Sequence, residues 1–260
     1  MMRRKHFLPN TFTALNLLCG FLAILNAADA QFVSASWLIL LGGAFDALDG
    51  RIARTVHAYS LFGVEADSMA DVVSFGVAPA VLSYRIGLYK LGHIGLLLGF
   101  LPLLFASVRL ARFNMQLRTL DRKPRFRGLP APAAAVAIAT FVIAYSGDDV
   151  LPKPNVLGAL NAFVSVLMVT NLSYEALPRF SLRAGGQNLF GLGYLVAWLV
   201  LSLSWPRLFM FPLWMVYVLS GPGYHLAKLL TGSRGAEAEA VGEREGAEGC
   251  LLYTSPSPRD

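Results

Sequence analysis

Long apolar stretches, separated by short polar ones, run through most of the chain. A helix needs about 20 predominantly apolar residues to cross a bilayer, and eight stretches approach or reach that length. They cover residues 12–28, 32–53, 61–84, 91–108, 130–145, 156–172, 189–205 and 208–219. The pattern predicts an all-α integral membrane helical bundle with about eight transmembrane helices.

The composition agrees with a membrane protein. Of the 260 residues, 55% are hydrophobic and only 15% are charged, whereas soluble domains carry about 25% charged residues. These proportions exclude a soluble globular domain and a disordered chain. The net charge of +6 would suggest a nucleic-acid partner in a soluble protein, but Lys and Arg collect on the cytoplasmic side of membrane proteins. We therefore expect membrane lipid, and no nucleic acid, around this chain.

The basic residues also predict the orientation in the membrane. With the N-terminus inside, the cytoplasmic segments contain Arg3, Arg4, Lys5, Arg51, Arg54, Arg109, Arg112, Arg118, Arg122, Lys123, Arg125, Arg127, Arg179, Arg183, Lys228, Arg234 and Arg244. The opposite side contains far fewer, namely Arg85, Lys90, Lys153 and Arg207. This excess predicts a multi-pass protein of the cell (inner) membrane with both termini in the cytoplasm.

The last part of the chain differs from the rest. We expect a membrane-embedded domain at 1–231, followed at 232–249 by an Ala/Glu/Gly-rich stretch that has the composition of a disordered polar tail. Residues 250–260 read CLLYTSPSPRD. We interpret these eleven residues as translated sequencing-adapter read-through and exclude them from the fold.

Acidic residues interrupt the second and third apolar stretches. They are Asp46, Asp49, Glu65, Asp67 and Asp71. Each carboxylate inside a membrane helix costs about 2.5–3.5 kcal/mol on insertion scales, so something must compensate. The spacings i, i+3 and i, i+4 place each aspartate pair on one helical face. Two such faces brought together would gather four carboxylates, whose hard oxygen ligands suit Mg²⁺ or Mn²⁺.

The residues between the aspartates add a second signal. Small residues allow a helix or a ligand to approach closely, and an arginine offers a planar fork of donors to a pyrophosphate. The stretch Asp46-Ala-Leu-Asp49-Gly50-Arg51-Ile-Ala53-Arg54, followed after eight residues by Gly63-Val-Glu-Ala-Asp67-Ser-Met-Ala-Asp71, resembles the signature of the CDP-alcohol phosphatidyltransferase family at every fixed position.

The resemblance implies roles for individual residues. The aspartates 46, 49, 67 and 71 match metal-binding positions, and Asp71 also matches the position of the general base. A CDP-linked lipid would be bound by Gly50, Ala53, Arg54, Ser60 and Gly63. Ser60 lies outside the fixed pattern, and a loop or helix-cap serine remains an alternative for it.

Other stretches resemble one branch of that family, the membrane-integral phosphatidylserine synthases of bacteria. They cover residues 8–16, 71–79, 109–114, 128–134 and 217–222. This resemblance implies CDP-diacylglycerol and L-serine as substrates, and a homodimer. Because serine carries a carboxylate, its site should contain a fixed cation, and Arg109 and Arg112 follow the fourth apolar stretch on the cytoplasmic side. Ordinary positive-inside anchors are the alternative for these two arginines.

Two other functions stay open at this point. The same chemistry could use a phosphorylated alcohol, either glycerol phosphate or inositol phosphate, as acceptor. A cation transporter would also gather carboxylates within the membrane, but it would need a path to both faces and would have no use for the small residues and the arginine of the signature. A structural membrane component would have no reason to bear the insertion cost.

The predicted orientation can be tested with single cysteines. In a chain whose two native cysteines are replaced by alanine, Arg122→Cys and Asp149→Cys should react with a membrane-impermeant thiol reagent from opposite sides of sealed vesicles. Reaction from the same side would show that the number of spans between these positions is wrong.

Overall fold

The computed structural model describes residues 7–56, 61–118, 128–146, 153–170, 172, 200–202 and 204–230. Within these ranges the chain is helical and has no strand. The elements are α1 (Phe7–Ala28), α2 (Phe32–Val56), α3 (Leu61–Asp71), the π-helical turn η2 (Val72–Val77), α4 (Ala78–Ile86), the 3₁₀ turn η3 (Leu88–Leu91), α5 (Gly92–Arg118), α6 (Ala131–Tyr145), α7 (Pro154–Val169) and α9 (Pro206–Leu230).

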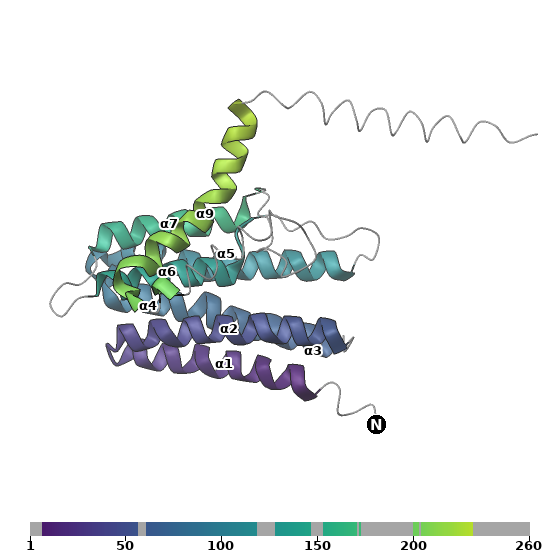
Figure 1. Cartoon of the computed structure of the whole chain (residues 1–260). Helices are drawn as coiled ribbons and strands as arrows, with labels where there is room; N and C mark the ends of the chain where they lie inside the picture. The colour runs from purple at the N-terminus through teal and green to yellow at the C-terminus, as the bar shows by residue number, and fades with distance from the viewer. Residues whose placement is uncertain are drawn as a thin grey trace, which may run out of the picture.

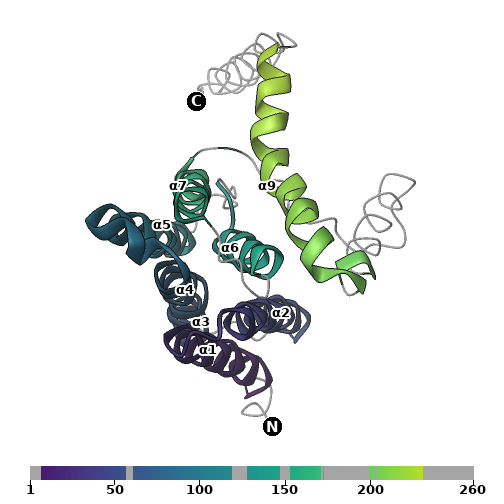
Figure 2. The ribbon, with the colours of Figure 1, turned by 90° about the vertical axis from the view of Figure 1, so that its left-hand side faces the viewer.

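Helices α1 to α7 run side by side along one axis, while α9 crosses them obliquely and its last turns extend beyond the bundle (Figure 1). Seen along the axis, α6 lies in the middle, between α2, α4, α7 and α9 (Figure 2). Nearly every residue of α6 is buried. Its sequence, APAAAVAIATFVIAY, is rich in alanine, and such small side chains let neighbouring helices approach closely inside a membrane protein.

The first four apolar stretches form helices that are long and apolar enough to cross a membrane. These helices cover Thr11–Ala28, Phe32–Gly50, Gly63–Ile86 and Leu88–Met115. The fifth and sixth stretches form the shorter apolar helices α6 and α7, and 208–219 lies within α9. Most of 189–205 and the whole of 232–260 lie outside the described residues. The prediction of a helical membrane bundle is thus confirmed for the described residues, and the total of eight spans stays a prediction.

The fourth stretch continues as a helix further than the hydrophobic pattern indicates. Helix α5 ends at Arg118, so Arg109 and Arg112 lie on the helix itself and not beyond a span that ends at residue 108. The sequence after Val108, RLARFNMQLR, consists mainly of Arg, Leu, Ala, Met and Gln, which favour helix irrespective of hydropathy. A hydropathy window cannot detect such a polar extension.

The third span is bent into close contact with α1. It runs through α3, η2 and α4 without a break, and the π-helical turn brings Ser74 against α1, where its Oγ donates a hydrogen bond to the main-chain oxygen of Asn16 (2.9 Å). A Cβ atom at Gly20 would collide with Ser74 Oγ. Gly20 therefore sets how closely α1 and the third span approach, immediately beside the acidic residues.

Candidate metal and substrate site

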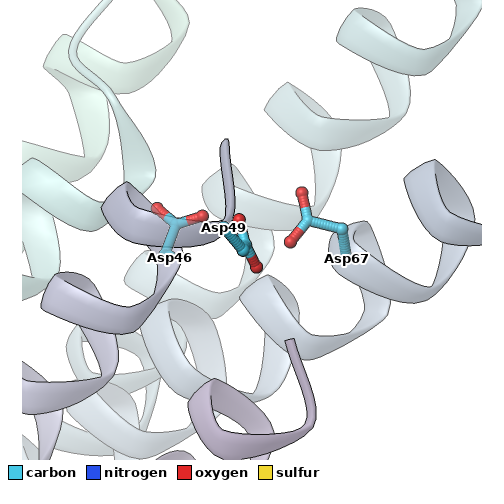
Figure 3. A group of neighbouring side chains, drawn as sticks. All are labelled: Asp46, Asp49 and Asp67. Atoms are coloured by element: carbon cyan, nitrogen blue, oxygen red, sulfur yellow. The ribbon is translucent and has the colours of Figure 1, made fainter. Parts of the chain in front are cut away.

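Three of the predicted aspartates form a compact cluster, which we call the aspartate triad. Asp46 and Asp49 come from α2 and Asp67 comes from α3, and one carboxylate oxygen of each lies within 4.8 Å of the others. Figure 3 shows the three side chains pointing toward one another across the gap between the two helices. Asp49 is buried, and the other two are half-buried. Glu65, the fifth acidic residue, is not a member of the triad.

The triad has the properties of a site for a divalent cation. The carboxylates of Asp49 and Asp67 lie within hydrogen-bonding distance of each other, and like charges this close repel unless a proton or a cation lies between them. Asp67 Oδ1 is buried and has no hydrogen-bond partner among the described residues. Carboxylate oxygens are the ligands that Mg²⁺ and Mn²⁺ prefer, so these residues fit the implied metal.

Asp71 is adjacent to the triad but is not part of it. It is only 8% exposed, and its Oδ1 accepts a hydrogen bond from Asn16 Nδ2 at 3.2 Å. It still interacts electrostatically with all three members of the triad. The sequence predicts four carboxylates around one point, whereas the structure brings three together and places the fourth against α1.

Helix α1 contributes two hydrogen-bond donors to the site, and neither donor residue belongs to the signature. Thr13 Oγ1 donates to Asp49 Oδ2 at 3.0 Å, one helical turn before Asn16 donates to Asp71. Residues three apart share one helical face, so a single face of α1 serves aspartates of both α2 and α3. The available signal was the presence of two polar side chains at this spacing within an apolar span.

Helix α5 closes another side of the site. Asn114 Nδ2 donates to Ser68 Oγ at 3.0 Å, and Ser68 lies between Asp67 and Asp71 in α3. Arg109 is half-buried and interacts electrostatically with Asp71 and with Tyr217 of α9. Its Nε is buried without a hydrogen-bond partner among the described residues. Arg112, by contrast, is exposed, so only one of the two predicted arginines faces the aspartates.

The structure describes some of the remaining signature residues more fully than others. A Cβ atom at Gly50 would meet none of the described residues within 4 Å, so no packing contact within the described part of the chain requires a glycine there. Gly63 is half-buried in α3, and Ala53 and Arg54 lie in the last turns of α2. Ser60 lies outside the described residues.

The sequence of this chain is similar to those of known proteins. A family model described as CDP-alcohol phosphatidyltransferase matches residues 6–175. A CDP-diacylglycerol–serine O-phosphatidyltransferase of Helicobacter pylori is 40% identical over 172 residues, which cover 65% of this chain and 72% of the relative. The Bacillus subtilis protein of the same name is 34% identical over 179 residues, 69% of this chain and 94% of the relative. An archaetidylserine synthase of Methanothermobacter thermautotrophicus is 37% identical over 169 residues, 64% and 69% of the two chains.

If the aspartate triad binds the metal, substitutions in it should weaken metal binding. Asp46→Asn and Asp67→Asn should each weaken Mn²⁺ binding, measured by electron paramagnetic resonance on the purified protein, by more than the 10- to 100-fold typical of losing a partner outside the ligand shell. Both variants should remain in the membrane, because removing a charge eases insertion. Glu65→Gln makes the matched change in α3 outside the triad and should bind Mn²⁺ like the wild type. Equal losses in all three variants would contradict a site at the triad.

Proposed function

Because the chain belongs to the CDP-alcohol phosphatidyltransferase family, we propose that it is a CDP-diacylglycerol–serine O-phosphatidyltransferase. It transfers the phosphatidyl group of CDP-diacylglycerol to the hydroxyl of L-serine and yields phosphatidylserine and CMP. The observation that carries the proposal is the aspartate triad, which brings together residues from both halves of the signature. The names of the relatives from Helicobacter pylori and Bacillus subtilis support serine as the acceptor.

The triad and its surroundings are suited to a pyrophosphate. Asp46, Asp49 and Asp67 would hold Mg²⁺ or Mn²⁺, with Asp71 as a further ligand, and the metal supplies positive charge that neutralises the phosphates during transfer. Because Gly50 itself has no side chain and none of the described residues lies within 4 Å of where its Cβ would be, we assign to it the close approach of the nucleotide to Asp49. Together with Gly50, we assign Ala53, Arg54, Ser60 and Gly63 to binding of the CDP-linked lipid.

Asp71 is our candidate for the general base. It takes the proton of the serine hydroxyl, the serine oxygen forms a bond to the phosphorus that carries the diacylglycerol, and the bond from that phosphorus to the CMP oxygen breaks. Its place beside the triad but outside it supports this role, because a base must reach the hydroxyl of the acceptor and keep an oxygen free to take its proton. General-base catalysis contributes typically 10²–10⁴-fold in rate.

Arg109 is our candidate for the group that binds the serine carboxylate. Its guanidinium is half-buried, is close enough to Asp71 to interact with it, and has an unpartnered Nε. A charged donor left unpaired in a buried position is costly, and a carboxylate ligand would satisfy it. A serine bound there would have its hydroxyl near Asp71. The exposed Arg112 is assigned to the cytoplasmic surface.

We place the reacting end of the bundle at the cytoplasmic face of the inner membrane. The C-terminal part of α2, helix α3 and the C-terminal half of α5 lie at one end of the bundle (Figure 1), and these segments contain the aspartates and Arg109. At the other end, Arg85 donates a hydrogen bond to the main-chain oxygen of Ala28 at 2.6 Å. Within the described residues, Arg51 and Arg54 of α2 and Arg112 and Arg118 of α5 belong to the first of these ends, as expected for the cytoplasmic side.

The choice of acceptor provides the test of this function. Purified protein in detergent with Mn²⁺ should release CMP from CDP-diacylglycerol when L-serine is added, and not when glycerol phosphate or inositol phosphate is added. Ethanolamine, which has a hydroxyl but no carboxylate, should be a poor acceptor. Arg109→Leu should lower kcat/KM for serine by about 10- to 100-fold, the value of one or two charge-assisted hydrogen bonds, and should narrow the preference for serine over ethanolamine.

Arg112→Leu makes the same change one turn along α5 and should have a smaller effect, because that side chain is exposed. CMP release that requires a phosphorylated alcohol would overturn the serine assignment while keeping the family chemistry. Metal uptake into sealed vesicles without any CMP release would instead favour the transporter alternative.

A further inference from the structure

Asn16 is a fully enclosed polar side chain next to the reacting aspartates. It lies in the middle of α1 and is 0% exposed. The family signature, which covers residues 46–71 of this sequence, does not include it. Its Nδ2 donates to Asp71 Oδ1 at 3.2 Å. The bond joins α1 to α3 across 55 positions of sequence. The donor for Asp71 therefore comes from a helix that contains no member of the aspartate triad.

The surroundings fix Asn16 from three directions. Its main-chain oxygen accepts the hydrogen bond from Ser74 Oγ, and Gly20 leaves the space that Ser74 needs. On the α2 side, a Cβ atom at Gly42 would lie only 3.0 Å from Asn16 Oδ1. A side chain packed so closely has little freedom to turn, which is what holding a reactive group in one orientation requires.

The hydrogen bonds of the Asn16 amide favour a role in positioning Asp71 over a role only in joining two helices. Its Oδ1 is buried and has no hydrogen-bond partner among the described residues. Leaving a buried acceptor unpaired is unfavourable, so an amide selected only to join two helices would be expected to pair both of its ends. Here the amide gives its donor to Asp71 and leaves its acceptor unpaired, so the side-chain hydrogen bond that Asn16 makes among the described residues goes to the reacting group.

We propose that Asn16 is a positioning residue for Asp71. By holding Oδ1 of that carboxylate, it fixes the side chain in one orientation and leaves Oδ2 for the proton of the acceptor alcohol. The inference rests on the proposed function, because it takes Asp71 as the base. It assigns to Asn16 a part in the rate of transfer and no part in binding CDP-diacylglycerol.

The test compares two hydrogen bonds between the same two segments. Asn16→Leu removes the amide at similar volume, and Asn16→Ala repeats the loss without the risk of overpacking against Gly42. Ser74→Ala removes the other bond, from Ser74 to the Asn16 main chain, without touching Asp71. For each variant, kcat and KM are measured by CMP release, CDP-diacylglycerol affinity by direct binding, and stability by the unfolding midpoint in detergent.

A positioning role predicts that both Asn16 variants lose about 10- to 100-fold in kcat, as removal of an orienting partner typically does. Their affinity for CDP-diacylglycerol should stay near that of the wild type, and Ser74→Ala should keep its kcat. Combined with Asp71→Asn, Asn16→Leu should cause no further loss, because residues that act as a unit are not additive.

Equal losses of kcat in Ser74→Ala and Asn16→Leu, or independent losses in the double variant, would overturn the proposal and leave Asn16 as a helix contact. Failure of the proposed function looks different, since the wild type itself would then release no CMP with serine. If another alcohol serves as acceptor, the same comparison is made with that alcohol and decides the role of Asn16 separately.

Discussion

The cost of placing carboxylates within membrane helices is the constraint on which the rest of this structure depends. Each of the aspartates in α2 and α3 would oppose insertion if it faced lipid. The fold meets the cost by turning them toward one another and toward donors on other helices. Asp49 accepts from Thr13, and Asp71 accepts from Asn16. The close approach of α1 to the third span, which Gly20 permits, is therefore a condition for the site and not merely for packing.

The same arrangement suits an amphiphilic substrate. A CDP-linked lipid has acyl chains that stay in the bilayer and a highly charged pyrophosphate that needs cations and donors. A polar cluster at one end of an apolar bundle lets both parts be accommodated at once. Helices α1, α2 and α3 hold the acidic side of that cluster, and α5 adds the cationic Arg109 near Asp71. The cluster thus combines carboxylates that can hold a metal with a fixed cation, and phosphoryl transfer uses positive charge directed at the phosphates.

Much of this could be predicted from the sequence, because the strongest signals are local. The apolar stretches predicted the four spanning helices, and the i, i+3 spacing predicted that Asp46 and Asp49 lie together. The contacts between distant segments could not be predicted in this way. That Asp67 joins the triad while Asp71 pairs with Asn16, and that Arg109 turns inward while Arg112 is exposed, depends on how the helices rotate against one another. Periodicity within one helix does not determine that rotation. Arg109 and Arg112 were also expected beyond the fourth span, since hydropathy ends before the helix does.

The central claim is that Asp46, Asp49 and Asp67 together hold a divalent metal within the membrane-spanning bundle. Crystals of the wild-type protein grown with Mn²⁺ test it most directly, through the anomalous scattering of manganese. We expect an anomalous peak at a coordination distance of about 2 Å from carboxylate oxygens of all three aspartates. Manganese bound elsewhere, with the three carboxylates free of metal, would contradict it.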